Sequence, residues 1–139
     1  MSFLLDTNVV SEWMKPQPNA GLVEWLSNVD EDRVFISVVT LTEIRYGIER
    51  MATGSRRKNL EEWLQHELPI RFEGRILPVD EAVADSSGRV AAQRDAAGRP
   101  MGAIDAFLAA TAEVHRLTLV TRNQSDFKAV LKTTLTPWS

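Results

Sequence analysis

The chain contains 139 residues, of which 44% are hydrophobic and 25% are charged, and this size and composition predict a single folded domain over residues 1–139. The absence of cysteine excludes disulfides, thiolate zinc sites and cysteine nucleophiles. The net charge of −3 is atypical of a nucleic-acid-binding protein, but twelve of the sixteen basic residues are arginine, whose planar side chain suits phosphate.

Two further exclusions concern the location of the protein and one class of nuclease. No apolar run approaches the roughly 20 residues that a membrane span requires, and no basic leader precedes a long apolar stretch at the first residues. We therefore expect a cytoplasmic protein with no membrane partner. With His66 and His115 as the only histidines, a ribonuclease that relies on two catalytic histidines is disfavoured.

The first half of the chain predicts two strands and four helices. Residues 3–5 and 34–36 are short apolar runs, whereas apolar residues such as Leu41 and Ile44 recur at helical intervals. A residue that precedes proline disfavours the helical conformation, so we expect the last of these helices to end before Pro69. The predicted elements are a strand at 3–5, helices at 9–13 and 20–28, a strand at 34–36, and helices at 39–52 and 56–68.

The second half continues the alternation of strands and helices. Asp80 is placed to cap a helix that Gly98 ends. The predicted elements are a strand at 75–77, helices at 81–97 and 102–115, a strand at 117–121, a short helix at 126–131 and an edge strand at 134–136. Short apolar strands that alternate with helices indicate an α/β domain of three layers, with a central parallel sheet flanked by helices.

Polar residues follow the predicted strands at the points where the strands end. Asp6 follows the first strand, Glu43 comes after the second, and Asn123 and Asp126 follow the fourth. Asp105 lies within an otherwise apolar helix. In parallel sheets the functional crevice lies beyond the carboxyl ends of the strands, so we expect these side chains to share one edge of the sheet.

Local structural roles could explain each residue taken alone. Asp6 could cap the following helix, and Glu43 could complete a capping box with Thr40. Asp105 could complement the positive end of its helix dipole, and the polar residues after the fourth strand could simply shape a turn. Three neighbouring polar residues fit local hydrogen bonding, which leaves them able to orient a metal-bound water: Thr7, Asn8 and Thr121.

The acidic residues taken together predict a metal site. Carboxylates that converge on one crevice repel each other and raise each other's pKa unless a cation neutralises them. Oxygen ligands without histidine or thiolate select hard ions such as Mg²⁺ or Mn²⁺. Such an ion activates water, and a pair of ions stabilises both the attacking and the leaving oxygen in phosphodiester cleavage. No catalytic histidine is needed for this chemistry.

Four segments of the sequence carry a resemblance to PIN-domain nucleases, in particular to VapC and FitB-like toxins. Together they extend over almost the whole chain, in the order typical of the family. The TPW sequence at residues 136–138 also resembles the end of FitB-like members. The four segments are LLDTN at 4–8, TLTEIRYG at 40–47, IDAFLAA at 104–110 and LVTRNQSDF at 119–127.

The resemblance implies a PIN fold, Mg²⁺ or Mn²⁺ as cofactor, and endonucleolytic cleavage of RNA that leaves a 5′-phosphate. It also implies the toxin of a type II toxin–antitoxin system, with a cognate antitoxin, a homodimer and a larger toxin–antitoxin assembly. By position, Asp6, Glu43 and Asp105 match the acidic metal ligands of the family. The fourth acidic position falls on Asn123, which brings no charge, and nearby Asp126 is the candidate to compensate.

Three alternatives remain beside a nuclease. A PIN domain that binds RNA or a protein with weak catalysis fits the uncharged Asn123 and the acidic net charge, and metal-dependent turnover separates it from an active enzyme. A receiver-type phosphoacceptor domain requires a lysine at the end of a late strand, and no lysine occupies such a place. A phosphatase of the haloacid dehalogenase type requires a second aspartate where Asn8 stands.

Overall fold

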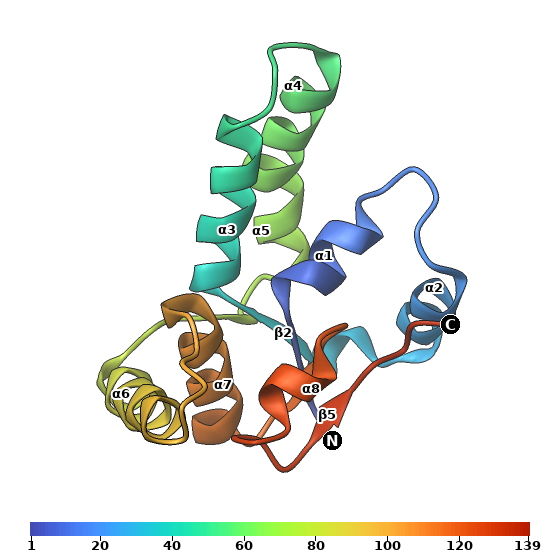
Figure 1. The fold of residues 1–139 in the computed structure, drawn as a ribbon. Helices are drawn as coiled ribbons and strands as arrows, with labels where there is room; N and C mark the ends of the chain where they lie inside the picture. Colours follow the sequence, from blue (N-terminus) through green and yellow to red (C-terminus); the bar gives the residue numbers. More distant parts are fainter.

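The computed structural model describes residues 1–139 and has a central sheet of five parallel strands in the order β3-β2-β1-β4-β5 (Figure 1). Strand β1 lies in the middle, where Phe3 pairs with Val34 of β2 and Leu5 pairs with Val120 of β4. The strands are β1 (Phe3–Leu5), β2 (Val34–Ser37), β3 (Ile76–Leu77), β4 (Thr118–Val120) and β5 (Thr134–Leu135). The predicted parallel sheet is therefore confirmed, including its last edge strand.

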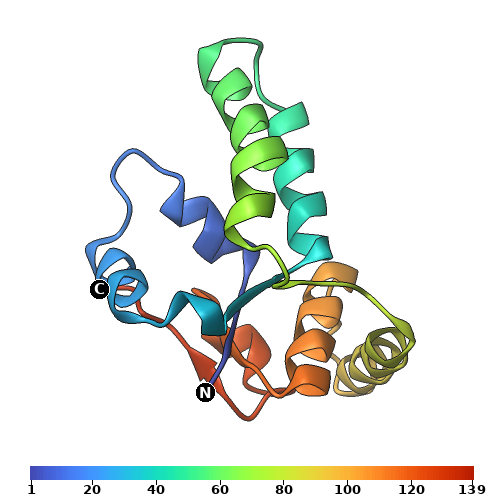
Figure 2. The ribbon, with the colours of Figure 1, turned by 180° about the vertical axis from the view of Figure 1, so that it is seen from behind.

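Helices cover both faces of this sheet. Figures 1 and 2 show α3 beside the chain from α4 to α5, as a helical hairpin that projects from the body, and α6 beside α7. None of the helices combines the length and the apolar character that a membrane span requires. The helical elements are α1 (Thr7–Trp13), α2 (Ala20–Asn28), a 3₁₀ turn η1 (Glu31–Arg33), α3 (Val38–Glu49), α4 (Ser55–Glu62), a π-helical stretch η2 (Trp63–Glu67), α5 (Leu68–Arg71), α6 (Glu81–Ala96), α7 (Ala103–His115) and α8 (Gln124–Phe127).

Alternation along the strands divides the core between the two faces. In β1, Leu5 packs into a cluster with residues of α1, α2, α3, η2 and α5, whereas Leu4 packs into a second cluster with α6, α7 and α8. Leu119 and Val120 of β4 divide in the same way. Successive side chains of a strand point to opposite faces, so two short buried strands anchor both layers. This explains why the strands lack a polar face.

The helix predicted at 56–68 differs from the structure at its end. We expected it to stop before Pro69, but the helical path continues to Arg71. A π-helical stretch comes first, in which the amide of Leu68 donates to the carbonyl of Trp63, and Pro69 then falls in the first turn of α5. A first-turn residue needs no intrahelical amide bond, so proline is tolerated there. The expectation was wrong because the widened turn restarts the helix.

Candidate active site

The acidic residues singled out by the sequence lie at one edge of the sheet. Asp6 follows β1, and its amide donates to the carbonyl of Val120 at the end of β4, at 2.9 Å. Glu43 lies on α3, directly after β2, and Asp105 lies in the first turn of α7. Asp126 lies in α8, after β4. The carboxyl ends of the three central strands therefore supply or position the whole set.

Asp6 is held by hydrogen bonds from two other residues of the site. Its side chain is 5% exposed, and its Oδ2 accepts from Thr121 Oγ1 at 2.8 Å and from Asn8 Nδ2 at 3.2 Å. Asp6 occupies the N-cap position of α1, but its side chain makes no capping hydrogen bond. Its carboxylate therefore faces Thr121 and Asn8, while the nearby backbone amides of Thr7 and Asn8 help to lower its pKa.

Glu43 is oriented by a residue next to Asp6. Thr7 Oγ1 donates to Glu43 Oε1 and lies 3.3 Å from Thr40 Oγ1. A capping box between Thr40 and Glu43 is not formed, because α3 begins after Ser37, whose Oγ accepts from the Val39 amide at 3.1 Å. Thr40 instead lies inside the helix, buried, with its hydroxyl towards the site.

The carboxyl group of Asp105 lies within electrostatic range of three other carboxylates. Its pKa is raised from 3.8 to about 6, first by burial and then by Asp6, Glu43 and Asp126. No hydrogen bond contributes to stabilising its charged form. The pKa of Asp6 is also raised, chiefly by burial and further by Glu43, while the hydrogen bond from Thr121 opposes the rise. The site thus concentrates negative charge that a cation would relieve.

The loop after β4 is tied to the first turn of α1. Asn8 Oδ1 accepts from the Arg122 amide at 3.2 Å, and the amide of Asn123 donates to Thr121 Oγ1 at 3.0 Å. The side chains of Asn123 and Asp126 are exposed, and that of Asn123 makes no capping hydrogen bond to α8. Neither side chain makes a hydrogen bond within the protein that would keep it from binding a ligand.

Sequence reasoning placed the acidic residues at this edge but missed how they are held. It assigned Thr7, Asn8 and Thr121 to local hydrogen bonds that leave them able to orient a metal-bound water. Asn8 does make a local hydrogen bond, to Asp6, but Thr7 and Thr121 bond to carboxylates 36 and 115 residues away. Their position in the sequence was the available signal, because each lies within three residues of the end of a strand. Thr7 and Asn8 come just after Asp6 at the end of β1, and Thr121 follows the neighbouring strand β4.

The chemistry of the donor set fits a hard divalent cation. All donors are oxygen atoms, and the repulsion that raises the pKa of Asp105 is the kind that such an ion relieves. No three histidine, aspartate or glutamate side chains are gathered closely enough to form a complete ligand group. Mg²⁺ commonly binds through one or two carboxylates and completes its shell with water and substrate phosphate. The arrangement suits that mode of binding.

Comparison with known proteins agrees with this geometry. The sequence pattern of the PIN domain family matches residues 3–132. The chain is 38% identical over 135 residues to Toxin FitB of Neisseria gonorrhoeae, with 97% of each chain covered. It is 33% identical over 135 residues to VapC ribonuclease Y4jK of Sinorhizobium fredii, which covers 97% of this chain and 96% of the relative.

Solved structures share the fold over the full length. The crystal structure of FitAcB from Neisseria gonorrhoeae matches with a TM-score of 0.90 and 38% identity, covering 98% of each chain. A toxin–antitoxin complex from Klebsiella pneumoniae matches with a TM-score of 0.75 and 25% identity, covering 99% of each chain. The arrangement of strands and helices described above is therefore found in experimentally determined proteins.

Proposed function

The chain belongs to the PIN domain family, and we propose that it is a divalent-metal-dependent endoribonuclease that serves as the toxin of a toxin–antitoxin pair. The observation that carries the proposal is the convergence of Asp6, Glu43 and Asp126 on Asp105, whose pKa is raised to about 6 by burial and by their charges. Relatives named as a toxin and as a ribonuclease support it over nearly the whole chain. The product is expected to be RNA cut internally, with a 5′-phosphate.

Asp6, Glu43 and Asp105 would hold the ion, Mg²⁺ or Mn²⁺, with water completing its shell. When bound, the ion supplies an activated water and a polarised phosphate. The chain's own part is to position the oxygens: Thr121 and Asn8 hold the Asp6 carboxylate, and the Thr7 hydroxyl holds Oε1 of Glu43. With a pKa of about 6, the Asp105 carboxyl would be mostly charged near neutral pH and able to hold a cation, whose charge would offset the repulsion that raises this pKa.

Asn123 and Asp126 divide the role of a fourth acidic residue. Asn123 offers a neutral carbonyl oxygen at the start of α8, where its backbone is fixed by Thr121. Asp126 brings a charge that already acts on Asp105. The three proposed ligands Asp6, Glu43 and Asp105, together with one divalent ion, leave about one negative charge, so a second ion would arrive with the RNA phosphate.

The proposed partners are RNA, a cognate antitoxin and a second copy of the chain. A solved toxin–antitoxin complex with this fold supports the antitoxin. The antitoxin would inhibit cleavage by covering the carboxylates with a basic side chain. Its apolar residues would pack on the α3–α4 hairpin, where Met51, Leu60 and Trp63 are only partly buried. Co-purification from the native operon tests this, and a chain recovered alone and harmless to its host would contradict it.

A second candidate function is that of a PIN domain that binds RNA or protein with little turnover. The neutral Asn123 and the lack of a gathered three-carboxylate group favour it. The experiment that separates the two is incubation of the purified protein with structured and unstructured RNAs in Mg²⁺, Mn²⁺ or EDTA. Cleavage that EDTA abolishes and that the Asp105→Asn variant lacks supports the nuclease. Tight RNA binding without cleavage in any metal supports the binding module.

A further inference from the structure

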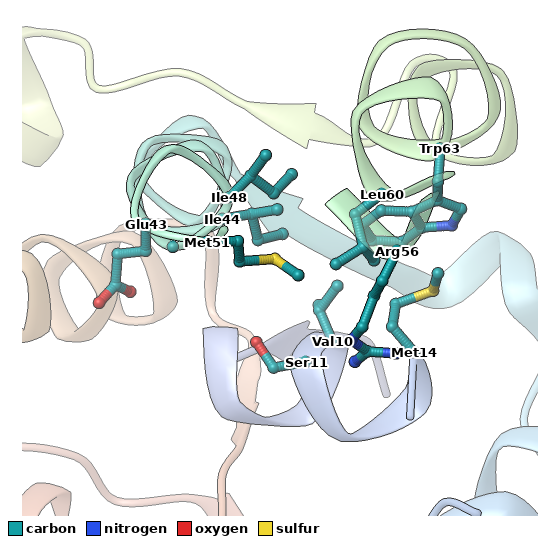
Figure 3. Close-up of a pocket in the computed structure, with 11 residues that line it drawn as sticks. Val10, Ser11, Met14, Glu43, Ile44, Ile48, Met51, Arg56, Leu60 and Trp63 are labelled. Atoms are coloured by element: carbon teal, nitrogen blue, oxygen red, sulfur yellow. The ribbon is translucent and has the colours of Figure 1, made fainter. Parts of the chain in front are cut away.

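A pocket of about 260 Å³ opens between α1, α3 and α4, with Glu43 among its lining residues (Figure 3). Most of its lining is apolar, and it includes Ile44, Met51 and Trp63. Glu43 lies at one end of the pocket, and Arg56 lies at the other. The pocket thus adjoins the proposed catalytic site through Glu43. Its walls include Met51, Leu60 and Trp63, which are also proposed to receive the antitoxin, so a ligand in the pocket and the antitoxin would compete.

Helix α3 presents a glycine to this pocket. Gly47 lies inside the helix, where glycine is less favourable than alanine. A Cβ atom added at Gly47 would meet no atom within 4 Å, so the packing of the chain itself does not require glycine there. A bare backbone beside an open space allows a ligand to approach closely.

Arg56 is a cation of the hairpin that forms no ion pair and lines the pocket. Arg45 pairs with Glu49, and Arg57 pairs with Glu49 and Glu61, but Arg56 takes part in no such ion pair. Figure 3 shows its side chain extending across the pocket towards α1, close to Met14. A free guanidinium above apolar walls suits a flat ring with acceptor atoms at its edge and a phosphate attached to it.

The charge of Arg56 favours a nucleotide as the occupant of the pocket. The pocket has a volume of about 260 Å³, mostly apolar walls and a guanidinium at one end. A nucleotide offers a flat ring to the walls and a phosphate to the guanidinium, whereas a purely apolar segment offers no group to Arg56.

We propose that this pocket receives one unstacked nucleobase of a single-stranded RNA segment, next to the phosphodiester bond that is cut. The proposal rests on the nuclease function proposed above. The base contacts the apolar walls and the backbone of Gly47, and Arg56 contacts its acceptor edge or the adjoining phosphate. Glu43, shared by pocket and carboxylate set, places the neighbouring phosphate at the metal site. Unstacked bases in single strands are the usual targets of such pockets.

The test fills the pocket without disturbing the core. Gly47→Leu adds a side chain where nothing lies within 4 Å of the Cβ atom. The matched control is Gly88→Leu on α6, where a Cβ atom also meets nothing and no pocket residue lies. Both are introduced into the Asp105→Asn protein, so that binding is measured without turnover. The probes are a short, fully abasic RNA backbone and the same backbone with a single base.

The single base is expected to strengthen binding to the Asp105→Asn protein and to its Gly88→Leu control by about five- to 100-fold. In Gly47→Leu the gain should largely disappear, and in the smaller Gly47→Ala it should shrink. The proposal is overturned if the single base raises the RNA affinity equally in all proteins, or in none of them. It is also overturned if the Gly47→Leu protein no longer binds a protein partner but still binds the RNA with one base more tightly than the abasic RNA. If the gain behaves as expected and the wild-type protein cuts no RNA, the nuclease proposal fails alone.

Discussion

The hydroxyl of Thr121 donates a hydrogen bond of 2.8 Å to the carboxylate of Asp6, across 115 residues of sequence. The two residues follow directly after β4 and β1, whose last residues, Val120 and Leu5, are paired. The bond therefore joins the ends of two neighbouring strands at the point where the acidic residues meet. It also lowers the pKa of Asp6 against the larger effect of burial, which keeps the carboxylate closer to its charged form.

Thr121→Val removes this donor while keeping the shape of the side chain. We expect the affinity for Mn²⁺ to fall by about 10- to 100-fold, because the carboxylate loses its orientation and its charged form loses a hydrogen bond. Calorimetric titration with Mn²⁺ measures the change. Thr121→Ser keeps the hydroxyl and should bind within a few-fold of the wild type. Equal affinity in Val and Ser variants would show that the bond does not orient a ligand.

Asp6→Asn and Asp105→Asn should each abolish cleavage while the protein stays folded. Each change removes one charge from the site and leaves the volume of the side chain almost unchanged, so the ion is weakened more than the core. Asp85→Asn is the control, because Asp85 is exposed on α6 and pairs only with Arg89. Turnover on a cleaved RNA and thermal melting are measured together. Wild-type turnover in either site variant would remove that residue from the metal site.

The stability of the metal-free protein should depend on pH through Asp105. Its folded pKa of about 6 lies above its ordinary value of 3.8, so the folded state binds the proton more tightly than the unfolded chain does. The stabilisation is fully present below about pH 4 and is lost as the pH rises through about 6.

The Asp105→Asn variant has no carboxyl group to ionise at this position, so it does not lose this stability as the pH rises. In EDTA it should be more stable than the wild type at pH 8, by on the order of 1 kcal/mol once screening of a half-exposed carboxylate is allowed for. The difference should shrink towards pH 4. Urea unfolding at several pH values gives the free energy of unfolding of both proteins as a function of pH. If the two curves run parallel, the other carboxylates do not raise the pKa of Asp105.

Asn123→Asp restores a charge at the one position that departs from the acidic set. We expect tighter binding of divalent metal, a lower Mg²⁺ concentration for half-maximal activity, and a lower melting temperature without metal, because the carboxylates repel more strongly. Calorimetric titration and melting of both proteins decide the matter. Unchanged affinity together with an unchanged metal-free melting temperature would place Asn123 outside the site and leave Asp126 as the better fourth ligand.

The fold and the acidic edge could be predicted because they depend on local patterns. Short apolar runs gave the strands, and parallel strands bring their carboxyl ends to one edge. The contact between Thr7 and Glu43 could not be predicted, since it requires the relative placement of two helices. The helix past Pro69 was missed because a π-helical stretch is a tertiary outcome without a propensity signal. The pocket at Gly47 needs three helices together, and no single segment encodes it.

The outer strands of the sheet, β3 and β5, are each two residues long. Such short edges offer almost no free backbone ladder to a neighbouring chain. Addition of strand to strand between copies of the protein is therefore disfavoured, which protects the sheet against fibrous aggregation. Substitutions on the surface of the helices can be made without touching these edges.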